Sequence, residues 1–181
     1  MGESTLNIEL GRRKIVRILI ISLLILINFI LESTLFQYTR VFGVKPDFTI
    51  ILITSYAIMR GSAFGGFIGL FSGLLQDLIF GNTMGINGLS YMITGYLIGQ
   101  SNENVFKDSF VPSVIFNIGA VFLYQHLFFL ITYFSKTNIS YTHALLNIII
   151  PQSIYNAILG PIAYRLIYKL DEKSFMNNKI Y

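Results

Sequence analysis

Residues 61–81 read GSAFGGFIGLFSGLLQDLIFG, an apolar run in which a small or acidic residue returns at every fourth position. These residues are Gly61, Gly65, Gly69, Gly73, Asp77 and Gly81. Small residues at this interval let helix backbones approach closely in lipid, where packing replaces the hydrophobic drive. A carboxylate within such a run is costly unless it has a partner or faces water. The stretch therefore predicts a tightly packed membrane helix with one polar group near its end.

The composition extends this prediction to the whole chain. Of the 181 residues, 54% are hydrophobic and only 12% are charged, and the mean hydropathy is +0.64. Average soluble domains carry roughly twice that charged fraction. We therefore expect an all-α, polytopic integral membrane protein. Its parts would be a cytoplasmic segment over 1–14, a single transmembrane domain over 15–170 and a cytoplasmic tail over 171–181.

The apolar residues fall into six runs. They cover residues 15–31, 48–59, 63–80, 86–100, 110–134 and 143–168. The second run has only 12 residues, which is about 18 Å of helix against a hydrocarbon core of about 30 Å. We expect it to borrow residues from 41–47, to thin the bilayer or to pack inside the bundle. Pro151 interrupts the last run and either kinks one long helix or begins a new one.

The distribution of basic residues favours six spans with both termini in the cytoplasm. In that orientation 10 of the 13 Lys and Arg residues lie inside, and Arg40, Lys45 and Lys136 lie outside. Five spans would leave 6 inside and 7 outside. Basic residues concentrate on the cytoplasmic side of membrane proteins. Their position at span ends therefore indicates topology, and we expect no nucleic-acid partner.

The same orientation brings three carboxylates to the outer face. They belong to Glu32, Asp47 and Asp77. Asp77 lies within about 40° of Gly73 on a helical wheel, so it is expected to point into the bundle. Its predicted partner is Arg40, Lys45 or the backbone N–H groups of a helix end. A structural or capping role and a contact with a partner or ligand both remain open.

Two patterns predict contacts between helices. The glycine series is expected to pack helices within the chain, although an interface with a second molecule is the alternative. In the last two runs, Gln125 and His126 accompany a series at every fourth position, formed by Gln152, Asn156 and Gly160. Polar groups in spans commonly bond across helices, each contributing about 1 kcal/mol or less. We expect hydrogen bonds between these helices.

Signs of catalysis and of cofactor binding are missing from the sequence. The chain has no Cys, which excludes disulfides and thiolate chemistry, and its two His residues are 17 positions apart. That spacing does not suit a metal site, because neither has a second His or a carboxylate at ligand spacing. Nucleophile, metalloprotease and phosphate-binding motifs are also absent. We therefore predict a protein that is not an enzyme and that carries no cofactor or metal.

Several segments resemble the bacterial rod-shape-determining MreD family. They are VKPDF at 44–48, MRG at 59–61, GGFIGLFSGLLQDL at 65–78, GYLIG at 95–99 and GPIAYR at 160–165. The resemblance is strongest over residues 44–100. It implies a small multi-pass protein of the bacterial inner membrane, with a fold similar to the six-helix substrate-binding component of energy-coupling-factor transporters.

The resemblance also implies a function, namely a non-catalytic scaffold of the cell-wall elongation complex. Such a scaffold binds the bitopic protein MreC and connects, through it, to peptidoglycan glycosyltransferase and transpeptidase and to MreB filaments. Self-association stays open. The candidate partner-binding or structural residues are Asp47, Asp77, Pro46, Gly65, Gly69, Gly73, Arg40 and Lys45. The alternative is the substrate-capture component of a vitamin or metal transporter. The short loop 81–87 (GNTMGIN) favours the scaffold, because it has no charged or aromatic side chain for a ligand.

Overall fold

The computed structural model describes residues 2–34, 44–80, 84–101, 110–134 and 141–171. Every regular element in these ranges is a helix, as the all-α prediction requires. In chain order they are α1 (Gly2–Thr34), α2 (Phe48–Arg60), α3 (Ser62–Phe80), α4 (Ile86–Gly99), α5 (Phe110–Phe134), α6 (Tyr141–Ala144), the π-helix η2 (Leu145–Ile149) and α7 (Ile150–Asp171). Arg40 and, of the predicted tail, residues 172–181 lie outside the described residues.

Helix α2 is the centre of the bundle. All of its residues from Thr49 to Met59 are buried, and it contacts α1, α3, α4, α5 and α7. A helix that is apolar all round must be covered all round, so the short second run is explained by packing inside the bundle. At 13 residues, α2 is about 20 Å long and needs no lipid-exposed surface of its own.

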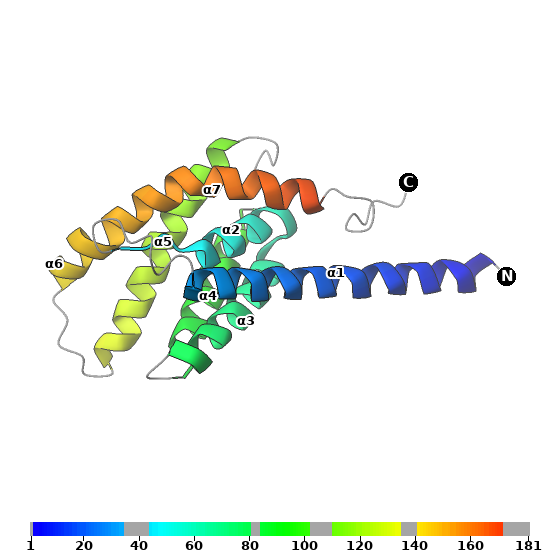
Figure 1. Cartoon of the computed structure of the whole chain (residues 1–181), viewed down its shortest axis with the longest axis horizontal. Coiled ribbons are helices and arrows are strands. Elements are labelled where there is room, and N and C mark those ends of the chain that lie inside the picture. Colours follow the sequence, from blue (N-terminus) through cyan, green and yellow to red (C-terminus); the bar gives the residue numbers. More distant parts are fainter. Residues whose placement is uncertain (1, 35–43, 81–83, 102–109, 135–140, 172–181) are drawn as a thin grey trace.

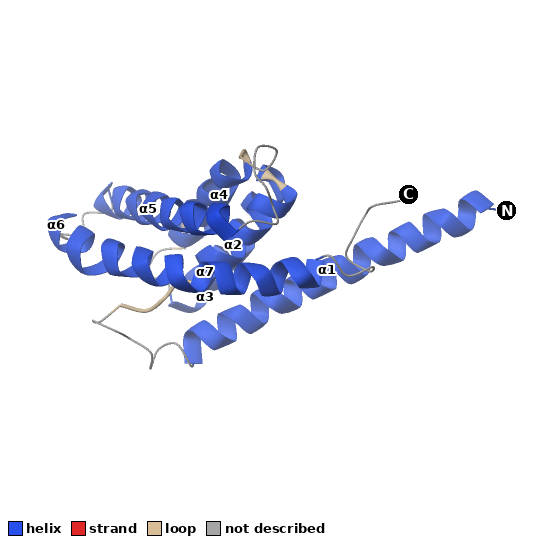
Figure 2. Ribbon diagram, turned by 90° about the horizontal axis from the view of Figure 1, so that it is seen from above, coloured by secondary structure: helices blue, strands red, loops and turns tan. Residues whose placement is uncertain are grey.

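The helices alternate in direction (Figures 1 and 2). The two ends of the molecule carry different charged side chains. The start of α1 and the end of α7 lie at the same end in both views, and the first turns of α1 extend beyond the bundle. At this end Arg60 Nη2 lies 2.6 Å from Asp171 Oδ1, which ties α2 to α7. We call it the basic end, because Arg17 interacts there with both residues. The opposite end, which holds Glu32, Asp47 and Asp77, is called the carboxylate end.

The glycine series packs α3 against α4. A Cβ atom built on Gly65 would lie 2.5 Å from the carbonyl oxygen of Gly95, and one on Gly73 would lie 2.6 Å from the carbonyl carbon of Asn87. Real Cβ contacts essentially never come this close, so only glycine fits at these positions. The predicted packing within the chain is therefore confirmed.

The last helical segment runs from α6 through η2 to α7, and Pro151 is the second residue of α7. Proline lacks an N–H group, and its ring clashes with the carbonyl four residues earlier in a regular helix. The π-helical turn η2 stands directly before it and widens the helix at this point. The last run therefore forms one continuous helical segment, Tyr141–Asp171, whose helical geometry changes just before Pro151. Pro151 does not begin a separate helix.

Four helical segments are long and apolar enough to cross a membrane. They are Ile15–Thr34, Ser62–Phe80, Val111–Tyr133 and Tyr141–Asp171. The shorter apolar helix Phe48–Arg60 accompanies them, and α4 has only 14 residues. The structure thus has the features of a multi-pass helical membrane protein. The two short helices α2 and α4 are each shorter than a full crossing of the membrane.

Candidate functional site

A chain of buried and partly buried polar side chains joins five of the helices and the segment before α2 at the carboxylate end. We call it the polar network. Its members are Asn28, Glu32, Asp47, Thr49, Gln76, Tyr91 and Asn156. They come from α1, from the residue before α2, and from α2, α3, α4 and α7.

Glu32 anchors α1 to the network. Its side chain is only 3% exposed, and its Oε2 accepts from the Thr49 hydroxyl at 2.6 Å and from Gln76 Nε2 at 3.1 Å. Thr49 Oγ1 in turn accepts from Asn28 Nδ2 at 2.9 Å. Asn28 and Glu32 are four positions apart and therefore share one face of α1. These hydrogen bonds connect three helices through one carboxylate with neutral donors.

Asp47 forms the second half of the network and caps α2. Its Oδ1 accepts from the backbone N–H of Ile50 at 2.9 Å, which satisfies one of the free donors at the helix start. Its Oδ2 accepts from the Tyr91 hydroxyl at 2.9 Å. The Asn156 amide bonds the Asp47 backbone twice, accepting from its N–H at 3.0 Å and donating to its carbonyl at 3.1 Å. Asp47 thus joins α2, α4 and α7, although their sequence positions are far apart.

Asp77 caps α4. Its carboxylate accepts three backbone N–H groups, from Gly85 at 3.0 Å, Asn87 at 3.1 Å and Gly88 at 2.9 Å. Four N–H groups are left free at the start of any helix, and a carboxylate there also meets the positive end of the helix dipole. Of the predicted partners, the backbone donors of a helix end are therefore confirmed. The arrangement assigns Asp77 a capping role.

Two stacked tyrosines connect the Asp77 cap to the polar network. The rings of Tyr91 and Tyr124 are parallel within 5°, with centroids 4.1 Å apart. The Tyr124 hydroxyl donates to Asn87 Oδ1 at 2.7 Å, and the Asn87 backbone bonds Asp77. Helix α5 thereby joins the other helices at the carboxylate end.

The remaining sequence candidates take different positions. Pro46 is buried directly before Asp47, while Gly65, Gly69 and Gly73 face α4 instead of the network. Lys45 lines a pocket of about 120 Å³ together with Glu32, Gln76 and Asn87.

Four members of the network were not singled out from the sequence. They are Asn28, Thr49, Gln76 and Tyr91. One signal was present, because Asn28 and Glu32 are the polar positions on an otherwise apolar face of α1. A buried carboxylate requires hydrogen-bond donors. Gln76 directly precedes Asp77, and Thr49 follows Asp47 by two positions, but spacing along the sequence does not show that both reach Glu32.

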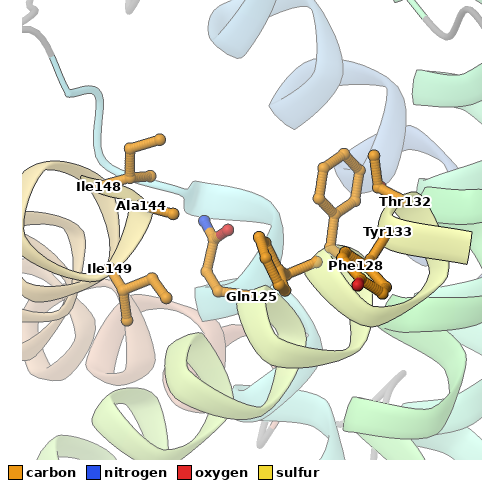
Figure 3. Close-up of a pocket in the computed structure, with 8 residues that line it drawn as sticks. Gln125, Phe128, Thr132, Tyr133, Ala144, Ile148 and Ile149 are labelled. Atoms are coloured by element: carbon orange, nitrogen blue, oxygen red, sulfur yellow. The ribbon is translucent and has the colours of Figure 1, made fainter. Parts of the chain in front are cut away.

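A second group of polar contacts links α5 to the last segment, as predicted. Gln125 Nε2 donates to Gln152 Oε1, and His126 Nε2 hydrogen-bonds with the Tyr141 hydroxyl at 2.7 Å. Figure 3 shows Gln125 between the α5 rings and the side chains of α6 and η2. The cavity lined there by Phe128 and Ile149 measures about 70 Å³, which suits a few small molecules of the size of water and no cofactor.

Removing the Tyr91 hydroxyl tests the network directly. A Tyr91→Phe substitution leaves Asp47 Oδ2 without its tyrosine donor, and hydrogen bonds to charged groups contribute about 1.5–3 kcal/mol. When the Tyr91→Phe variant is heated in detergent, we expect its monodisperse fraction to fall at a clearly lower temperature than that of the wild type. The matched control is Tyr96→Phe on the same helix, because Tyr96 is 49% exposed. Equal losses for the two variants would contradict the importance of this hydrogen bond.

The fold and the network together define the class of protein. It is a multi-pass helical membrane protein whose helices are joined by close glycine contacts and buried hydrogen bonds. In the described residues, no three His, Asp or Glu side chains form a group that could hold a metal ion.

The chain belongs to the MreD family. The family model described as rod shape-determining protein MreD matches residues 12–173, so the resemblance seen in the sequence is confirmed. Comparisons with curated proteins and with solved structures gave no match. Membership of this family implicates the chain in rod shape determination. The proteins of the family are shape-determining and are not known as enzymes.

Proposed function

We propose that this protein is a non-catalytic scaffold of the cell-wall elongation complex in the bacterial cytoplasmic membrane. It would bind an MreC-like bitopic protein and, through it, connect to peptidoglycan glycosyltransferase and transpeptidase and to MreB-like filaments. The observation that carries the proposal is that the buried polar groups of the carboxylate end bond one another across the helices. Such a network favours a fixed shape, which suits a platform for other proteins.

The proposed topology has six crossings, with both termini in the cytoplasm and residues 15–170 in the membrane. Two observations support it. The start of α1 and the end of α7 lie at the same end of the molecule (Figure 1), as an even number of crossings requires. The basic end would face the cytoplasm, in agreement with the positions of 10 of the 13 basic residues. The carboxylate end would then face outward.

The alternative of a substrate-capture component is less well supported. Sites for small molecules and cofactors usually measure about 300–1,000 Å³. The pocket that reaches the polar network, with Glu32 and Lys45 in its wall, measures about 120 Å³. A vitamin would therefore have to displace hydrogen-bonded side chains to bind there.

Co-purification tests the scaffold directly. We expect the full chain, isolated from native membranes in mild detergent, to bring down the host's MreC-like protein in a stoichiometric complex. Vitamins added to the purified protein are expected to leave its thermal stability unchanged. A Ser33→Ala variant, which removes only an exposed hydroxyl bonded to Ile30, should recover as much partner as the wild type.

The scaffold proposal would be rejected if no partner co-purified and a vitamin stabilised the protein. That result would support the substrate-capture component of a transporter. A partner recovered together with a stabilising vitamin would reject the purely structural role.

A further inference from the structure

An apolar cleft of about 590 Å³ lies between α1 and α3. Its walls come from one face of α1, from Ile18 to Leu26, and from α3, from Phe64 to Leu75. Phe67 and Phe71 in this wall are 63% and 58% exposed, so the cleft opens sideways, toward lipid. Ser22 is the one polar side chain among the lining residues. The occupant must therefore be apolar over most of its length.

The length of the cleft corresponds to one leaflet of a bilayer. The stretch of α3 from Phe64 to Leu75 rises about 16 Å, which is half of a hydrocarbon core of about 30 Å. The next residue, Gln76, donates to Glu32, so the polar network closes the cleft at the carboxylate end. A crossing helix of another protein would need a groove through both leaflets, whereas one acyl chain needs only this depth.

The other end of the cleft carries two guanidinium groups. Arg17, Ile21 and Ile25 follow one another at every fourth position of α1 and are all buried, so Arg17 continues the wall of the cleft by one turn. Arg60 lies 5.6 Å above the ring of Phe64, which is itself a lining residue. Asp171 interacts with both cations, and the local balance of these three side chains is positive.

We propose that this cleft is a binding site for an anionic phospholipid of the inner leaflet. One acyl chain fills the apolar cleft, and the phosphate lies at the basic end near Arg17 and Arg60. Guanidinium groups match phosphate geometry, and basic residues close to an anionic leaflet are attracted to its headgroups. The assignment to the inner leaflet rests on the topology proposed above. The lipid would add apolar packing between α1 and α3 along the cleft.

Native mass spectrometry of the full chain in mild detergent tests the site. The probes are dioleoyl phosphatidylglycerol and dioleoyl phosphatidylethanolamine, which share their acyl chains. We expect at least tenfold more bound phosphatidylglycerol than phosphatidylethanolamine at equal concentration. Ser22→Trp, which fills the cleft, should lower this binding at least fivefold. Ile162→Trp, at a position 61% exposed on α7, is the matched control and should not change it. Arg17→Gln should reduce the preference for phosphatidylglycerol.

A second measurement needs no variant. Photoreactive phosphatidylglycerol should label peptides from 18–26 or 64–75, and labelling confined to other segments would overturn the proposal. Equal binding of the two lipids would also overturn it. Crosslinking of a Ser22→Cys variant is a third test, because the chain has no other Cys. A crosslink from Ser22→Cys to the partner's transmembrane segment, together with loss of lipid labelling, would overturn the proposal as well. The lipid assay requires no partner, so its failure and the failure of the scaffold are separate results.

Discussion

A Gly69→Leu substitution is expected to separate α3 from α4 and to destabilise the protein by about 3 kcal/mol, at the upper end of the range for overpacked cores. A Cβ atom at this position would lie 2.6 Å from the carbonyl carbon of Tyr91 and 2.9 Å from the backbone nitrogen of Met92. Both are main-chain atoms of a helix, so they cannot turn aside as a flexible side chain could. The helices themselves must move apart.

The consequence extends beyond the helix pair, because the Tyr91 hydroxyl on α4 donates a hydrogen bond to Asp47. Moving α4 would break that hydrogen bond and loosen the polar network. We expect the monodisperse fraction of the purified protein to fall at a much lower temperature than for the wild type. Recovery of the MreC-like partner should fall in parallel.

Gly119→Leu is the matched control for this experiment. Gly119 also lies in a membrane-spanning helix, α5, and a Cβ atom there would meet no heavy atom of the described residues within 4 Å. The same substitution should therefore leave stability and partner recovery near wild type. If Gly69→Leu behaved like Gly119→Leu, the glycine series would not be required for helix packing.

The sequence predicted where each helix lies better than it predicted which helices contact one another. Apolar runs located α3 and α5 to within one residue, because long periodic segments in lipid have few competing structures. The shortness of the second run was also informative. An apolar helix of 13 residues is shorter than a full crossing of the membrane, so it buries its apolar side chains by packing between other helices. The glycine interval indicated close packing and the partner helix was then identified by the structure.

The candidate site was predicted in part. The sequence placed Asp47 directly before the second run and Asp77 near the end of the third. A capping role was one of the two readings of Asp77, because carboxylates commonly accept from the free N–H groups at a helix start. The link between Glu32, Gln76 and Tyr91 was not visible, since it joins three helices through side chains that have no common interval. Such contacts depend on how helices rotate about their axes, and hydropathy carries little of that information.

Asp77→Ala is expected to have the largest effect of any polar substitution. Three backbone N–H groups at the start of α4 would lose their acceptor at once. Because each hydrogen bond to a charged acceptor contributes about 1.5–3 kcal/mol, a loss of about 3 kcal/mol is expected even after water reaches the more open donors. Helix α4 would fray from its first turn.

Asp77→Asn separates the role of hydrogen bonding from that of charge. In the wild type one carboxylate oxygen accepts from Gly85 and Gly88, and the other accepts from Asn87. The amide oxygen of asparagine can keep the first pair, but its NH₂ group would oppose the Asn87 donor. We therefore expect a thermal stability between those of the wild type and Asp77→Ala. Wild-type behaviour of both variants would show that α4 needs no cap, and a loss of partner at wild-type stability would instead place Asp77 in a binding surface.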